Sequence, residues 1–183
     1  SDRVRVKQAI SRMVGQKTTM MGNRHSIALV EALSIERGEP GTLDMVFARE
    51  CAGLRAGDAE VCRLEVETEA RALGRDANHE GDETIRALTA LFAGLRTIDA
   101  PKTLILITEG FVSTEASRII ELGAMAASAR TSVYAMKLDG PLFDITTSRA
   151  PINQFADRQA QSEGLEMLAG AARLLCEQRD TLA

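Results

Sequence analysis

Aromatic residues are scarce in this 183-residue sequence: they make up 3% of it, with no tryptophan and a single tyrosine, Tyr134. The core must therefore be built from aliphatic side chains, and few rings are present on which nucleic-acid bases could stack. Basic residues are not in excess either, because 22 Lys and Arg stand against 26 Asp and Glu, a formal net charge of −4. Since nucleic-acid binding relies on a basic surface, the composition argues against that class of partner.

Long apolar runs are also missing. No stretch approaches the roughly 18 residues of a membrane-spanning helix, so we expect no span. The two histidines, His25 and His79, lie far apart, and the cysteines follow no zinc-binding spacing. Phosphate-binding glycine loops and the Gly-x-Ser-x-Gly elbow of hydrolases do not occur. The chain begins at Ser1 rather than Met, so we expect that an N-terminal segment has been removed.

Two of the three cysteines, Cys51 and Cys62, flank a turn-like segment at residues 52–58. A local disulfide between two helix ends is sterically plausible at this spacing. The alternative is two small unpaired residues in a reduced protein. The redox compartment decides between them, and the sequence leaves both open.

The most informative segment is a short apolar run, residues 103–107, which follows Pro101 and stops at Thr108-Glu109-Gly110. A run of this length between such breakers predicts a parallel strand over 102–108 that is buried on both faces. Ligands of open α/β sheets bind at the carboxyl ends of the strands. Glu109 is therefore expected at the functional edge of the sheet.

A second strand is predicted at residues 132–138, ended by Asp139-Gly140. The segment between the strands predicts a helix that is capped by Ser113 or Thr114 and runs to about residue 130. Its inward positions are Ile119, Leu122, Gly123 and Ala126. Strand, helix and strand together form a right-handed crossover unit.

The other segments favour helices, at residues 2–14, about 25–35, 42–50, 58–98 and about 162–175. Alternating apolar residues leave a strand near Ile27 as an alternative. Gly74 and Gly81 each cost about 1 kcal/mol in a helix interior, so 58–98 is interpreted as one helix or as two that meet near residues 78–82. Two strands need neighbours and helices on both faces. We therefore expect the chain to be the carboxyl-terminal part of a larger domain, the alternative being a hidden third strand near Ile27.

Three segments resemble consecutive elements of von Willebrand factor type A domains: Lys102-Thr-Leu-Ile-Leu-Ile-Thr-Glu-Gly110, Thr131-Ser-Val-Tyr-Ala-Met-Lys-Leu-Asp139 and Glu163-Gly-Leu-Glu-Met-Leu-Ala-Gly170. The resemblance implies an α/β, three-layer, Rossmann-like fold with a type A core at about 81–175 and a helix-rich insert at about 16–80. The stretch Ala32-Leu-Ser-Ile-Glu-Arg-Gly38 and the paired cysteines are similar to divergent type A-related domains of bacterial envelope or secreted proteins. A periplasmic, cell-envelope or secreted location is therefore expected.

Type A domains often hold Mg²⁺ or another divalent cation in a metal-ion-dependent adhesion site. Such cations prefer hard oxygen ligands. By resemblance, Thr84 and Glu109 occupy two of the ligand positions. The Asp-x-Ser-x-Ser motif is absent, and Glu109 stands where the family has Asp, so the expected site is incomplete or degenerate. Simpler interpretations are Thr84 as a helix N-cap and Glu109 as an acceptor of backbone hydrogen bonds.

The function that the resemblance implies is a non-enzymatic protein-binding, adhesion or scaffold module. Its protein partner would contact loops around Glu109, Asp139 and Thr84, with Ser113 at the same edge. The alternative class is an α/β enzyme or nucleotide-binding domain whose catalytic residues lie in the missing N-terminal part. Ser113 has no His and Asp partners placed beside it in the sequence, so it is not a predicted nucleophile.

Overall fold

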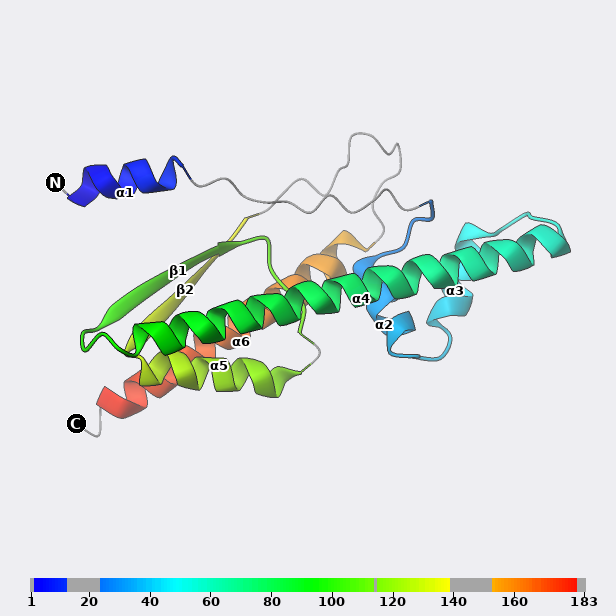
Figure 1. The fold of residues 1–183 in the computed structure, drawn as a ribbon. Coiled ribbons are helices and arrows are strands. Elements are labelled where there is room, and N and C mark those ends of the chain that lie inside the picture. The colour runs from blue at the N-terminus through cyan, green and yellow to red at the C-terminus, as the bar shows by residue number, and fades with distance from the viewer. Residues whose placement is uncertain (1, 13–23, 114, 139–152, 181–183) are drawn as a thin grey trace.

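The computed structural model describes residues 2–12, 24–113, 115–138 and 153–180. The elements, in chain order, are α1 (Asp2–Ile10), α2 (Leu29–Glu36), α3 (Thr42–Glu50), α4 (Ala56–Leu95), β1 (Lys102–Thr108), α5 (Ala116–Ser128), β2 (Thr131–Lys137) and α6 (Gln154–Asp180) (Figure 1). The fold is thus a helix-rich α/β arrangement. None of the described helices combines the length and apolarity that a membrane span requires.

The two strands form a parallel pair, with Lys102 opposite Thr131 and Thr108 opposite Lys137. Both predicted strands are confirmed, as is the helix that connects them. The cap prediction for α5 is wrong, because the residue before its first turn is Glu115; Ser113 lies two residues earlier, and Thr114 is outside the described residues. The four predicted inward positions of α5 are buried.

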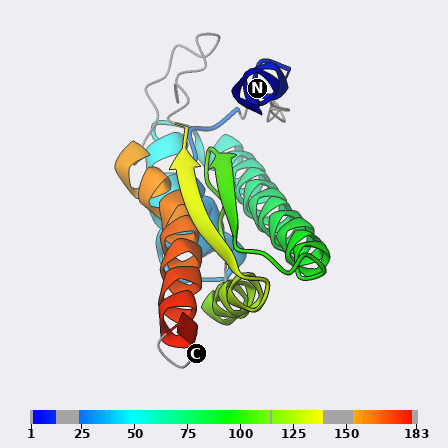
Figure 2. The ribbon, with the colours of Figure 1, turned by 90° about the vertical axis from the view of Figure 1, so that its left-hand side faces the viewer.

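Three helices, α4, α5 and α6, lie on one side of the strand pair (Figure 2). Their apolar faces meet beneath the sheet in the main core, which consists of Ile85, Leu88, Phe92, Phe111, Ile119, Leu122, Ala126, Val133, Leu165, Leu168 and Ala172. The aliphatic core that the composition requires is therefore made mostly between helices, with only the inward row of each strand contributing.

As far as the structure describes the chain, the opposite face of the sheet is open, and the prediction of strands buried on both faces is wrong. Ile105 and Ile107 of β1 are 59% and 45% exposed, while their partners Tyr134 and Met136 of β2 are 62% and 55% exposed. A continuous apolar run shows only that each side chain tolerates burial; it does not supply the second layer of helices. Among the described residues, the expected third layer is not formed, and no strand forms near Ile27, where α2 begins two residues later.

Helix α4 is continuous over 40 residues, which confirms the single-helix alternative and excludes two helices that meet near residues 78–82. The two glycines of that prediction allow close packing instead. A Cβ on Gly74 would lie 2.8 Å from the Cβ of Glu36 in α2, and a Cβ on Gly81 would overlap the backbone oxygen of Val112. Packing against these two segments outweighs the local helix penalty of glycine.

The N-terminal half of α4 carries a second cluster, in which it packs against α2 and α3 through Ile35, Val46, Cys51, Cys62, Val66 and Ala70. Cys51 and Cys62 form a disulfide with a Cα–Cα distance of 6.0 Å, which confirms the paired alternative. The sequence boundary expected near residue 80 falls inside α4. One long helix therefore joins the two clusters.

Candidate functional site

The chain turns sharply after β1, at the edge where a ligand site was expected. Gly110 adopts a φ of 111°, which favours glycine, and its N–H donates to Thr108 Oγ1 over 3.1 Å. A Cβ at this position would lie 2.6 Å from the backbone oxygen of Gln161 in α6. Phe111 N–H donates to the same oxygen over 3.2 Å, which brings the buried Phe111 ring into the core. Glu109 lies exposed at the outside of this turn.

A pocket of about 320 Å³ opens beside this turn. Its lining comes from α2 and the residue after it, α4, the loop after β1 and the start of α5: Glu36, Arg37, Asn78, Asp82, Val112, Ser113, Glu115 and Arg118. The close approach of Gly81 to Val112 places the middle of α4 against this loop. The predicted edge residue Ser113 therefore lies in a pocket, and its other walls come from segments that the sequence alone did not connect to it.

The charges around this pocket are mostly paired. Arg118 forms an ion pair with Asp82, and Arg37 pairs with Glu39 over 2.8 Å. Asn78 Nδ2 donates to Glu36 Oε2 over 3.3 Å, while its buried Oδ1 has no hydrogen-bond partner among the described residues. The pocket thus has a polar lining in which most of the charges are already paired.

Ser113 is not activated for nucleophilic chemistry by the described residues. Its hydroxyl donates to Glu115 O over 3.2 Å and accepts from Glu115 N–H over 3.3 Å, as in an ordinary local turn. His79 lies near Glu83, at 3.5 Å, and His25 contacts Glu69. No histidine of the described chain is thus placed as a base for Ser113.

The predicted cation site is not assembled by the part of the chain that the structure describes. Thr84 lies inside α4, where its hydroxyl donates to Glu80 O over 2.9 Å, so the N-cap interpretation of Thr84 is wrong. Its role as a cation ligand stays a prediction. Asp139 lies outside the described residues. No group of three or more His, Cys, Asp or Glu side chains that could hold a metal occurs among the described residues, and Glu109 therefore has no such cluster to join.

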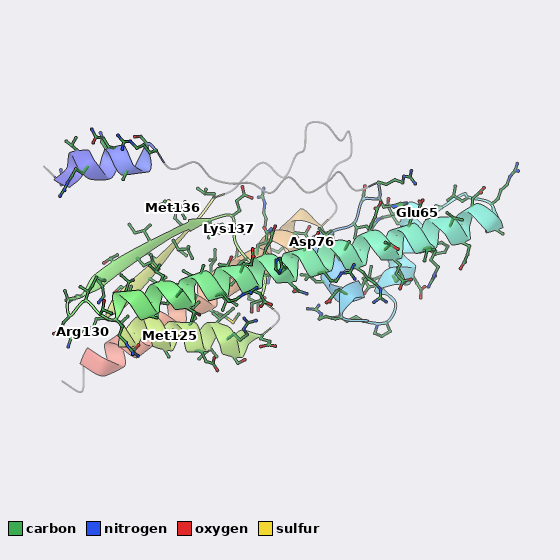
Figure 3. All side chains as sticks on the ribbon, viewed as in Figure 1. Glu65, Asp76, Met125, Arg130, Met136 and Lys137 are labelled. Atoms are coloured by element: carbon green, nitrogen blue, oxygen red, sulfur yellow. A yellow bond between two sulfur atoms is a disulfide. The ribbon has the colours of Figure 1, made fainter. Side chains whose placement is uncertain are left out.

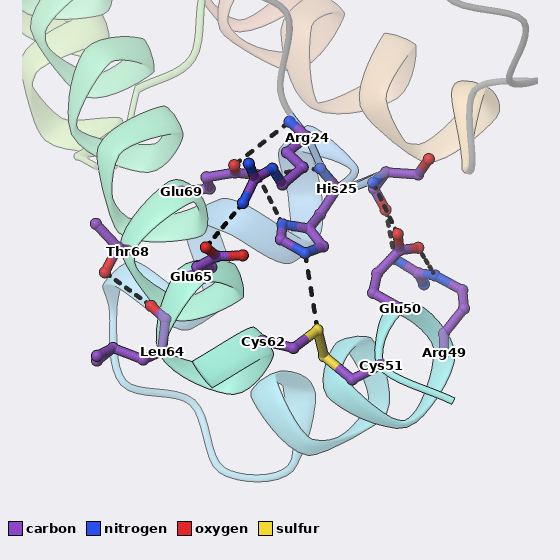
Figure 4. A network of polar contacts seen from close by, with 11 residues as sticks. Arg24, His25, Arg49, Glu50, Cys51, Cys62, Leu64, Glu65, Thr68 and Glu69 are labelled. Atoms are coloured by element: carbon purple, nitrogen blue, oxygen red, sulfur yellow. Dashed lines mark hydrogen bonds and ion pairs between the residues drawn. A yellow bond between two sulfur atoms is a disulfide. The ribbon is translucent and has the colours of Figure 1, made fainter. Parts of the chain in front are cut away.

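A second constellation surrounds the disulfide, and sequence reasoning missed it (Figure 4). His25 Nδ1 lies 3.0 Å from Glu69 Oε2, and its Nε2 lies 3.7 Å from Cys62 Sγ. The His25 side chain is 9% exposed. Because Glu69 is 44 residues away along the chain, no local pattern connects it with His25.

The backbone of this segment is held by carboxylates on two helices. Glu69 of α4 accepts hydrogen bonds from the N–H groups of Arg24, over 3.3 Å, and of His25, over 3.1 Å. Glu50 of α3 accepts from Ser26 N–H over 3.0 Å. These bonds satisfy the backbone N–H groups of an irregular segment that packs onto the helices. They also position the imidazole of His25.

Arg49 connects α3 to the same segment and to α2. Its guanidinium donates to both carboxylate oxygens of Glu31, over 2.7 and 2.9 Å, and to Ser26 O over 2.7 Å. The hydrogen bonds to Glu31 raise the pKa of Arg49 despite its partial burial. Burial raises the pKa of Glu31, but the hydrogen bonds from Arg49 and from Ala28 N–H, together with the charge of Arg49, outweigh it and leave that pKa lowered.

Comparison with known proteins returned no matching family model, no matching curated protein and no matching solved structure. The relationship to type A domains therefore depends on the sequence segments quoted above and stays a prediction.

Proposed function

We propose that this chain is a non-enzymatic protein-binding module of the adhesion or scaffold kind, and that its partner docks on the open face of the sheet. We define the open face by its outward residues, Thr103, Ile105, Ile107, Ser132, Tyr134 and Met136. The observation that carries the proposal is the exposure of four large apolar side chains side by side on this face.

Exposed apolar residues are ordinary when they are scattered, but a contiguous set indicates an interaction surface. The register makes this set contiguous, because Ile105 is opposite Tyr134 and Ile107 is opposite Met136. None of the six outward residues carries a formal charge. Figure 3 shows Met136 on the side of the sheet away from α5 and well separated from Glu65, which lies on the N-terminal half of α4. The partner surface must therefore be apolar as well.

The dimensions of the open face match a single helix. Parallel sheets normally have helices on both faces. Two strands about 4.8 Å apart present a strip roughly 10 Å wide, which is about the diameter of a helix with its side chains. Each strand has 7 residues, or about 23 Å at 3.3 Å per residue, the length of about 15 helical residues. The proposed ligand is thus an amphipathic helix of a partner protein.

Helix α1 of the same chain lies on this side of the molecule but is not packed on the sheet (Figure 1). Its Val4 is 55% exposed, and its composition is polar, with Asp2, Arg3, Arg5, Lys7 and Gln8 among its nine residues. A more apolar helix would cover the open face better, because the face offers no charged group for the Arg and Lys side chains of α1 to pair with.

The expected affinity is modest. Full burial of one large apolar side chain contributes about 1.5–3 kcal/mol, and the four side chains here are already about half buried. Covering them contributes roughly 3–6 kcal/mol, which is similar to the cost of bringing two molecules together. We therefore expect the open face alone to give dissociation constants weaker than micromolar, because a micromolar constant needs a net free energy of about −8 kcal/mol. Tighter binding would require that the partner also contacts the sheet edge.

Site-specific photocrosslinking in cells that produce the protein tests this proposal. A photoreactive phenylalanine analogue replaces Tyr134 in one variant and Leu64, a comparably exposed residue of α4 far from the sheet, in the matched control. We expect a discrete adduct with one protein from position 134 and none from position 64. The purified partner should then bind the unmodified chain, with Ile105→Asp weakening the binding more than tenfold and Leu64→Asp leaving it unchanged.

Two outcomes would overturn the assignment. An adduct between two copies of this chain would make the open face a self-association surface. Equal labelling at both positions, or a purified partner whose binding ignores Ile105→Asp, would remove the open face from partner recognition.

A further inference from the structure

The surroundings of the disulfide contain more chemistry than a structural crosslink requires. We propose that Cys51–Cys62 is a redox-active disulfide that exchanges with a dithiol, and that His25 donates a hydrogen bond from Nε2 to the sulfur of Cys62 when that sulfur leaves as a thiolate. This inference is independent of the proposed partner binding, because it concerns the opposite end of α4.

The imidazole of His25 lies between two acceptors. On one side is the Glu69 carboxylate, 3.0 Å from Nδ1, and on the other is the disulfide sulfur of Cys62, 3.7 Å from Nε2. Neither an ionised carboxylate nor a disulfide sulfur can donate a hydrogen bond. An N–H group on Nδ1 is directed at Glu69, and an N–H group on Nε2 is directed at Sγ of Cys62.

The imidazole does not depend on the disulfide for its position. The backbone N–H groups of Arg24, His25 and Ser26 are bound by Glu69 and Glu50, and Ser26 O is bound by Arg49. A purely structural disulfide would hold α3 to α4 equally well without a histidine at the sulfur. We therefore expect the histidine and its carboxylate to stay in place after the disulfide is reduced.

A reductant can approach Cys62 through a pocket of about 340 Å³, which is roughly the volume of ten water molecules in the liquid. Its lining includes Cys62 and His25, together with the exposed apolar side chains Leu54 and Val61. The charged groups around it are Arg24, Glu50, Asp58 and Glu65 on the rim and Glu69 behind the imidazole. Cys62, rather than Cys51, is the sulfur that the pocket reaches.

The reaction has two balanced steps. First, one thiolate of the dithiol attacks Sγ of Cys62, the Cys51–Cys62 bond breaks, and Cys51 leaves as a thiolate that takes up the proton lost by the attacking thiol. Second, the other thiol of the reductant loses its proton to solvent, and the resulting thiolate attacks the reductant's sulfur in the mixed disulfide. The bond between that sulfur and Cys62 breaks, and the reductant becomes a cyclic disulfide. Cys62 leaves as a thiolate beside the protonated imidazole. The protein disulfide gains two electrons, and the dithiol is oxidised.

After reduction, Cys62 is the sulfur paired with His25, and a thiolate beside an imidazolium is the reactive form of cysteine. Glu69 is a positioning residue in this scheme, because it touches the imidazole and not the sulfur. The two cysteines should therefore differ in reactivity, although both are nearly fully buried.

The test measures the second-order rate of reduction of the full chain by dithiothreitol at pH 7, followed by mass spectrometry of trapped thiols. The variants are His25→Ala, His25→Asn and Glu69→Gln, with His79→Ala as the matched control at the exposed histidine. Asn at position 25 can keep a donor for Glu69 while removing the proton directed at Sγ, so it serves if the alanine variant does not fold. We expect reduction to slow at least tenfold in both His25 variants and to stay unchanged in His79→Ala.

A second measurement separates a catalytic from a structural effect. In the reduced chain at pH 6, iodoacetamide should modify Cys62 at least tenfold faster than Cys51, as quantified on the separated peptides. His25→Asn should abolish the difference. A thioredoxin-type dithiol protein, used in parallel with dithiothreitol, distinguishes a protein reductant from a small one, and an effect of His25 in either arm supports the proposal. Equal reduction rates across all variants in both arms, or equal alkylation of the two cysteines, would overturn it.

Discussion

The packing of α4 against the loop after β1 can be tested with one substitution made at two glycines of the same helix. Gly81→Ala places a Cβ against the backbone oxygen of Val112, whereas Gly94→Ala places one in open space. Replacing a helical glycine by alanine contributes up to about 1 kcal/mol when nothing is in the way. Overpacking against a neighbour costs about 1–3 kcal/mol. A backbone oxygen cannot rotate aside as a flexible side chain does.

We therefore expect Gly94→Ala to raise the free energy of unfolding by about 0.5–1 kcal/mol and Gly81→Ala to lower it by about 1–2 kcal/mol. For a chain of this size, those changes correspond to a Tm about 1–3 °C higher and about 2–7 °C lower, respectively. The assay is urea unfolding followed by circular dichroism at 222 nm, with the urea dependence compared between variants so that midpoints reflect stability.

The two substitutions are expected to change the free energy of unfolding in opposite directions, and this difference is what tests the packing. If Gly81→Ala stabilised the chain as Gly94→Ala does, α4 would not lie against Val112. The pocket beside Ser113, which needs that contact, would then not exist in this form.

Three further predictions concern the helices around the disulfide. Because the pKa of Glu31 is lowered, its carboxylate should stabilise the fold above the ordinary value of 4.5, and this contribution should be lost as the pH falls through the folded-state pKa. In Glu31→Gln, the urea midpoint should therefore fall less between about pH 5 and pH 3 than it does in the unmodified chain. Burial raises the pKa of Asp157, which accepts Val30 N–H over 2.9 Å at the start of α2. Its protonated form therefore favours the folded state, and that contribution should be present below the ordinary value of 3.8 and lost as the pH rises through the folded-state pKa. Asp157→Asn should keep the acceptor and remove this pH dependence, whereas Asp157→Ala should destabilise the chain by about 1 kcal/mol in urea unfolding at pH 7. Replacing Cys51 and Cys62 together by serine opens a loop with a sequence separation of 11 and should lower the unfolding free energy by about 3 kcal/mol, while an unchanged melting curve would contradict a formed disulfide.

Part of the fold follows from local chemistry. The bounds of β1 were predicted, and β2 begins and ends one residue before its predicted bounds, because each strand is a short apolar and β-branched run. The inward residues of α5 follow from helical spacing alone, and they are buried as that spacing predicts. Helix α3 also has its predicted bounds, because Gly41 and the turn-like segment at residues 52–58 leave room for only one short helix between them.

The candidate sites were only partly accessible from the sequence. Ser113 lines a pocket after β1, but the wall opposite it comes from the middle of α4, where the two glycines had left a helix break open as an alternative. The N-cap interpretation of Thr84 failed for the same reason. A helix break near Gly81 would have placed Thr84 at the start of a new helix, and the local sequence does not distinguish that position from one inside a continuous helix. His25 had no visible partner, since Glu69 reaches it only after α4 has folded back against the segment before α2.

The sequence by itself determined the alternation of strands and helices, the aliphatic character of the core and the possibility of a Cys51–Cys62 pair, because these depend on neighbours a few residues apart. The tertiary structure decided that α4 is continuous, that His25 contacts both a carboxylate and a disulfide, and that one face of the sheet is open. These three features depend on which distant surfaces meet. Burial and close approach across the fold outweigh local preferences of about 1 kcal/mol per residue, and the spacing of residues along the chain does not encode them.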